Sequence, residues 1–117
     1  MKNKNIFNSF KCAFLGINEV LLKERNMKVH FSIMLLVISF GFIYKISAFE
    51  WISCLICFAL VIGSEMINTA IENTVDLVTK EINQYAKLAK DIATGAVLVN
   101  AIISSIIGFI IFIPKIF

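Results

Sequence analysis

Three carboxylates, Glu65, Glu72 and Asp76, share one face of a predicted helix. At 100° per residue they fall within about 40° of one another, with Asn68 and Thr69 beside them. Like charges at this spacing repel, and no lysine or arginine occurs between residues 63 and 78 to neutralise them. Carboxylate oxygens are ligands that divalent cations bind well. We therefore expect these three residues, the acidic stripe, to be held together by a bound divalent cation.

The composition requires the stripe to lie in or beside a membrane. Of the 117 residues 59% are hydrophobic and only 16% are charged, and the mean hydropathy is +0.87. A water-soluble domain of this size is closer to 45–50% apolar. The chain is therefore predicted to be one integral membrane domain over residues 1–117. Its net charge of +3 is too small to indicate a nucleic-acid partner. Cys54 and Cys57 lie in an apolar run without zinc-ligand spacing around them, so they are interpreted as helix-packing residues.

Four helical segments account for the pattern, which predicts an all-α fold. Apolar residues recur every three or four positions over about residues 5–24, as in an amphipathic helix that lies on a membrane surface. Three apolar segments follow, at about 29–46, at 51–79 including a cytoplasmic extension, and at 90–113, where Pro114 is expected to end the last one. Residues 80–90 read as a polar connection.

The basic residues predict the orientation. With three spans, nine of them lie on one side, and only Lys45 and Lys115 lie on the other. This bias places the amino terminus in the cytoplasm and the carboxyl terminus outside the cell membrane. Glu65 follows Trp51 by fourteen residues, or about 21 Å of helix, which puts it somewhat inside the cytoplasmic boundary of a hydrocarbon core about 30 Å thick. The stripe is therefore expected to run from lipid into cytosol.

A second cluster supplies groups that bind phosphate. Lys90 and Asp91 are predicted to open the third span, where a helix start favours anions, and Thr94 follows one turn later. Carboxylates for a hard cation and a lysine for phosphate are what phosphoryl transfer requires. The sequence has no Walker-type or protein-kinase glycine loop, so a nucleotide must be held by side chains and metal.

These motifs resemble the prokaryotic diacylglycerol kinase family. The resemblance rests on E-x-x-N-x-A-x-E at residues 65–72, VDL at 75–77 and AKLAKDIATGAVL at 86–98. The segments SFK at 9–11, AF at 13–14, GI at 16–17 and ERNMKVH at 24–30 are similar to the undecaprenol kinase branch of Gram-positive bacteria. The similarity covers nearly the whole chain.

The resemblance implies a homotrimer in a bacterial plasma membrane, with active sites shared between subunits at the cytoplasmic face. It implies transfer of the ATP γ-phosphate, with Mg²⁺, to a lipid hydroxyl, with undecaprenol favoured and diacylglycerol as the alternative. Glu65 matches the general base and a substrate-binding residue, and Asn68 and Thr94 match further substrate contacts. Glu24 and Glu72 match the metal ligands. The matching ATP contacts are Glu24, Glu72, Asp76, Glu81, Asn83, Lys90 and Asp91.

Two other classes of protein compete with a kinase. A small proton-coupled transporter predicts one acid near the membrane midplane and a further span, whereas here several acids crowd one interface. A non-enzymatic membrane adaptor would use the acidic stripe to dock a basic partner. Incubation of the purified protein with labelled ATP, Mg²⁺ and each lipid acceptor would distinguish the kinase, the transporter and the adaptor.

Overall fold

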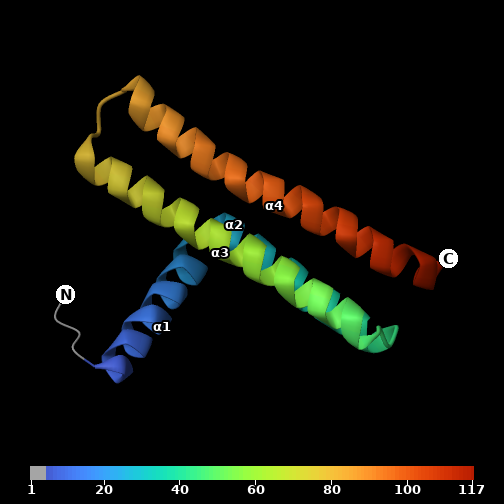
Figure 1. Cartoon of the computed structure of the whole chain (residues 1–117). Coiled ribbons are helices and arrows are strands. Elements are labelled where there is room, and N and C mark those ends of the chain that lie inside the picture. The colour runs from blue at the N-terminus through green and yellow to red at the C-terminus, as the bar shows by residue number, and fades with distance from the viewer. Residues whose placement is uncertain (1–4) are drawn as a thin grey trace.

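The computed structural model describes residues 5–117, and all the regular secondary structure over them is helical. Figure 1 shows the four helices in chain order, α1 (Ile6–Lys23), α2 (Arg25–Ile43), α3 (Ala48–Val78) and α4 (Gln84–Ile116). Three of them, α2, α3 and α4, are long and apolar enough to cross a membrane. The predicted all-α fold with three spans and an amino-terminal helix is therefore confirmed.

Helix α1 presents its apolar side to the surroundings. Asn5 caps its first turn by accepting a hydrogen bond from the Asn8 backbone N–H at 2.8 Å. Phe7, Phe10 and Phe14 are each more than half exposed, and no residue of α1 is buried. An exposed aromatic face on a helix beside three spans suits the membrane–water interface.

The turn between α2 and α3 closes around a glycine. The N–H of Ile46 donates to the Gly41 carbonyl at 3.1 Å, which ends α2 with the bond pattern of a Schellman motif. Lys45 takes the left-handed position of this motif, at φ 51°. A Cβ on Gly41 would lie only 2.6 Å from the Trp51 ring, so the indole packs directly on the α2 backbone.

Helices α3 and α4 run antiparallel and side by side (Figure 1). A capping box between Ser47 and Glu50 starts α3, which is 31 residues or about 46 Å long. Asn100 of α4 donates to the Leu60 carbonyl of α3 at 3.3 Å. An ion pair between Lys115 and Glu50, at 3.1 Å, joins the two helices at the end away from their connection. Both helices are longer than a hydrocarbon core of about 30 Å.

Two sequence expectations about α4 are corrected. The segment interpreted as a polar connection over residues 80–90 is helical from Gln84, because the Asn83 side chain accepts from the N–H groups of Tyr85 and Ala86 and caps the helix there. At the other end, Pro114 does not stop the helix, which continues to Ile116. A proline in the last turn removes only one backbone donor, and Phe117 still bonds to Ile113.

Candidate active site

The polar centre of the molecule lies on one face of α3. Glu65, Asn68 and Thr69 are the buried polar residues among those described, and Glu65 is only 1% exposed. The Thr69 hydroxyl donates to the Glu65 backbone carbonyl at 3.1 Å, so it is satisfied within its own helix. The helical period explains why these residues share a face, as predicted.

Two side-chain oxygens on this face have no hydrogen-bond partner in the described part of the chain. They are Glu65 Oε2 and Asn68 Oδ1, three residues apart and thus one helical turn from each other. A buried acceptor without a donor costs about 1–3 kcal/mol, and more when it is charged. Proteins retain such groups where a ligand or a reaction uses them. A ligand that brings a hydroxyl group to this point would satisfy Glu65.

Glu24 joins the stripe from a distant part of the sequence. It forms the half-buried junction between α1 and α2, in an extended conformation with its N–H donating to the Val20 carbonyl. From there its charge acts on Glu65, as does that of the half-buried Glu72. The fold therefore brings Glu24, Glu65 and Glu72 into one electrostatic cluster.

Asp76 has a basic partner that was not predicted from the sequence. Lys90 of α4 donates to Asp76 Oδ1 at 2.6 Å. The expectation that the stripe lacks a neutralising lysine is therefore wrong for Asp76, since the partner comes from the neighbouring helix. Glu65 and Glu72 have no such ion pair in residues 5–117.

The remaining predicted site residues lie on α4 and its connection to α3. Lys90 and Asp91 fall in the second turn of α4, so the expected anion site at a helix start is not at these residues. Asp91 is engaged by Lys87, whose Nζ lies 2.6 Å away on the exposed surface. Thr94 is exposed on the same helix. Glu81 and Asn83 are exposed in the connection, and Asn83 is occupied as the helix cap.

The described residues contain no set of three histidine, cysteine or acidic side chains already arranged around a metal position. Mg²⁺ does not require such a set, because it usually takes one or two carboxylates and completes its shell with water and phosphate oxygens. Glu24 and Glu72, both half-buried beside Glu65 and without a basic partner among the described ion pairs, supply hard oxygen ligands of this kind. The donor set therefore fits a magnesium ion that arrives with a nucleotide.

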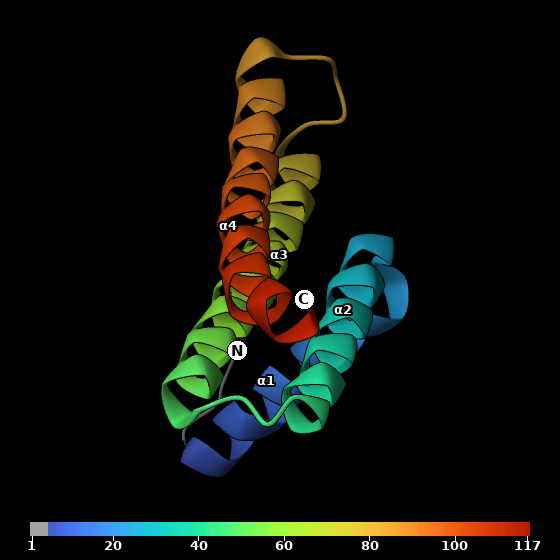
Figure 2. The same ribbon diagram turned by 90° about the vertical axis from the view of Figure 1, so that its right-hand side faces the viewer.

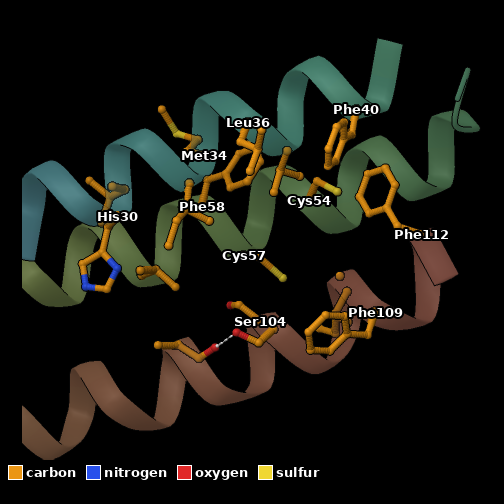
Figure 3. Close-up of a pocket in the computed structure, with 18 of the residues that line it drawn as sticks. His30, Met34, Leu36, Phe40, Cys54, Cys57, Phe58, Ser104, Phe109 and Phe112 are labelled. Atoms are coloured by element: carbon orange, nitrogen blue, oxygen red, sulfur yellow. Dashed lines mark hydrogen bonds between the residues drawn. The ribbon is translucent and has the colours of Figure 1, made fainter. Parts of the chain in front are cut away.

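A groove between α2, α3 and α4 was not foreseen from the sequence. Figure 2 shows α2 standing apart from α4. Mostly apolar side chains of α2, α3 and α4 line a cavity of about 460 Å³. Figure 3 shows His30 at one end of it and the Phe40 and Phe112 rings at the other, with Cys54 and Cys57 on its α3 wall. No motif marks these residues, because the groove depends on how far α2 leans from α4.

Comparisons with known proteins agree with the geometry. A family model described as prokaryotic diacylglycerol kinase matches residues 11–112. The chain is 44% identical to undecaprenol kinase of Bacillus subtilis (strain 168) over 109 residues, which cover 93% of this chain and 89% of that protein. It is 33% identical to a diacylglycerol kinase of Synechocystis over 94% of its length, spanning 63% of that relative. The resemblance inferred from the motifs is confirmed, and the chain belongs to the prokaryotic diacylglycerol kinase family.

Proposed function

We propose that this protein transfers the γ-phosphate of ATP to the hydroxyl of undecaprenol at the cytoplasmic face of the bacterial plasma membrane. The family match supports a lipid kinase, and the extent of identity with undecaprenol kinase favours undecaprenol as the acceptor. Diacylglycerol is the alternative acceptor, in keeping with the name of the Synechocystis relative. The apolar groove between α2 and α4 accords with a substrate that carries a hydrocarbon chain.

The unpartnered carboxylate oxygen of Glu65 carries this proposal. A lipid hydroxyl placed there donates its hydrogen to Oε2, and Glu65 takes the proton as the hydroxyl oxygen forms a bond to the γ-phosphorus. The bond between that phosphorus and the bridging oxygen of ADP breaks, which leaves a lipid phosphate and ADP. The side chains of Asn68 and Thr94 complete the acceptor side of the site.

The nucleotide side of the proposed site is assembled from four parts of the chain: the α1–α2 junction, α3, the α3–α4 connection and α4. Glu24 and Glu72 would hold Mg²⁺, which supplies charge neutralisation at the phosphate oxygens when it is bound. Lys90 adds a positive charge toward the phosphates, while Glu81, Asn83 and Asp91 are the proposed contacts along the rest of the nucleotide. Asp76 belongs to this group through its ion pair with Lys90.

The proposed assembly is a homotrimer with shared active sites, the amino terminus in the cytoplasm and the carboxyl terminus outside. The excess of basic residues near the connection of α3 and α4 and around α1 supports this orientation. Exposed apolar side chains on all three spans leave surface for both lipid and neighbouring subunits. In this orientation the end of α3 and α4 beside their connection lies in the cytoplasm, where ATP is available.

Transfer of label from γ-labelled ATP tests the proposal. Purified protein with Mg²⁺ is given undecaprenol or diacylglycerol in mixed micelles, and we expect faster labelling of undecaprenol. Glu65→Gln keeps the shape of the side chain but cannot accept the proton, so kcat is expected to fall about 100- to 10,000-fold. Binding of MgATP is expected to survive, since Glu65 serves the acceptor.

The matched control is Glu19→Gln, which makes the same chemical change in the exposed Glu19–Lys23 pair of α1 and is expected to leave turnover unchanged. Unaltered turnover in Glu65→Gln contradicts the base assignment. Absence of label in every lipid, from folded wild-type protein, contradicts the kinase itself.

A further inference from the structure

The ion pair between Asp76 and Lys90 joins α3 and α4 beside their connection. Asp76 lies two residues before the end of α3, and Lys90 lies in the second turn of α4. Their Nζ–Oδ1 distance is 2.6 Å, and the two side chains are 45% and 37% exposed. Both groups therefore remain accessible to a ligand from the cytoplasmic side, in contrast to the buried Glu65.

The ion pair restricts the position of the Lys90 ammonium but engages only one of its hydrogen-bond donors. A lysine ammonium has three N–H donors, and Asp76 Oδ1 accepts one of them. The lysine stem has four rotatable carbons, so an unpaired Lys90 would sample many positions around the stripe. One carboxylate contact fixes where the ammonium lies while two donors stay available for phosphate oxygens.

Asp76 is also the member of the stripe least suited to hold a metal ion. The charges of Glu24 and Glu72 act on Glu65, whereas the charges that act on Asp76 are those of Lys90 and Lys80. A carboxylate already engaged by an ammonium at 2.6 Å is a poor ligand for a second cation. The stripe thus divides into a metal-facing part and a lysine-facing part.

We propose that Asp76 is a positioning residue, which acts on the nucleotide only by holding the Lys90 ammonium against the phosphates. This inference rests on the proposed kinase function and changes the role expected for Asp76 from a direct ATP contact to an indirect one. It predicts that loss of Asp76 matters only while Lys90 is present.

A double-mutant cycle tests this dependence. The full-length proteins Asp76→Asn, Lys90→Gln and the double variant are compared with wild type for the KM of ATP, the KM of the lipid and kcat. Equilibrium binding of a fluorescent non-hydrolysable ATP analogue with Mg²⁺ gives a readout independent of turnover. The unfolding midpoint without nucleotide reports whether each variant folds.

We expect Asp76→Asn to raise the KM of ATP by roughly 10- to 100-fold, the scale of a misplaced binding group, with little change in the KM of the lipid. The double variant is expected to match Lys90→Gln alone, because Asp76 has nothing left to position. Asp76→Glu, which keeps the charge, is expected to recover part of the affinity. Glu19→Gln in the exposed pair of α1 serves as the control and should change none of these values.

Three results overturn the inference. If the effects of Asp76→Asn and Lys90→Gln multiply in the double variant, Asp76 contacts the nucleotide or its metal directly. If Asp76→Asn lowers kcat and the unfolding midpoint but leaves the KM of ATP unchanged, the ion pair only stabilises the packing of α3 on α4. An unchanged KM for ATP in Asp76→Asn also refutes it. Wild-type protein that neither binds MgATP nor transfers phosphate overturns the proposed function as well, which distinguishes the two failures.

Discussion

Gly41 offers a direct test of how α2 packs on α3. Replacement by alanine would place a Cβ 2.6 Å and 2.8 Å from two carbons of the Trp51 ring and 3.2 Å from Ile46 Cδ1. Ordinary contact begins at 3.4 Å, so the ring must retreat by about 0.8 Å. The indole is rigid and also packs at a tilt of 54° against Phe42, with ring centroids 5.0 Å apart, so a rotamer change of Trp51 would disturb this second contact.

Overpacking of this kind costs about 1–3 kcal/mol. Alanine also gains up to about 1 kcal/mol over glycine in a helix, which would mask part of the loss. Gly63→Ala is the matched control, because Gly63 is also within a span and nothing described lies within 4 Å of its added Cβ. Both variants gain the same helix propensity from alanine. The difference between their free energies of unfolding therefore measures the clash alone, which is expected to be about 1–3 kcal/mol.

Unfolding in mixed micelles measures the two free energies, and the fluorescence of Trp51 reports on the contact itself because it is the chain's single tryptophan. We expect Gly41→Ala to unfold at lower denaturant than Gly63→Ala and to shift the emission of the native state. When Trp51→Phe is combined with Gly41→Ala, the clashing part of the ring is removed, and the loss of stability caused by Gly41→Ala is expected to shrink. Circular dichroism follows the unfolding of this double variant, which lacks the tryptophan signal. Equal midpoints for the two alanine variants, with unshifted emission, refute the packing described here.

Two further substitutions test the helix ends. Lys45→Gly is expected to stabilise the protein by about 1 kcal/mol, because glycine adopts the left-handed backbone at φ 51° without strain, whereas Lys45→Ala should give no gain. A gain from alanine as large as that from glycine would assign the effect to charge and contradict the backbone argument. Asn83→Ala is expected to cost about 1 kcal/mol in nucleotide-free unfolding, because α4 loses its cap, while Asn83→Ser should retain most of it. Equal losses for alanine and serine would show that the side-chain cap is not what starts α4.

The helices and the acidic face were predictable because both depend on spacing along one segment. A charge-free apolar run of sufficient length identifies a span wherever it packs. Likewise, Glu65 and Asn68 share a face by the period of the backbone alone, and the structure finds both buried on α3. The start of α4 was missed because Asn83 and the polar residues after it read as a connection, although Asn83 is a strong helix cap.

Contacts between helices could not be predicted from the sequence, because they depend on turn geometry and on how closely the helices approach each other. The sequence by itself determined three helices able to span a membrane, an amphipathic amino-terminal helix and a line of carboxylates, since each follows from local periodicity and hydrophobicity. Only the tertiary structure decided that Lys90 meets Asp76, that Glu24 joins Glu65, and that α2 leans away from α4 to leave a groove. Residues far apart in the chain acquire a common site only when the packing of whole helices fixes the distance between them.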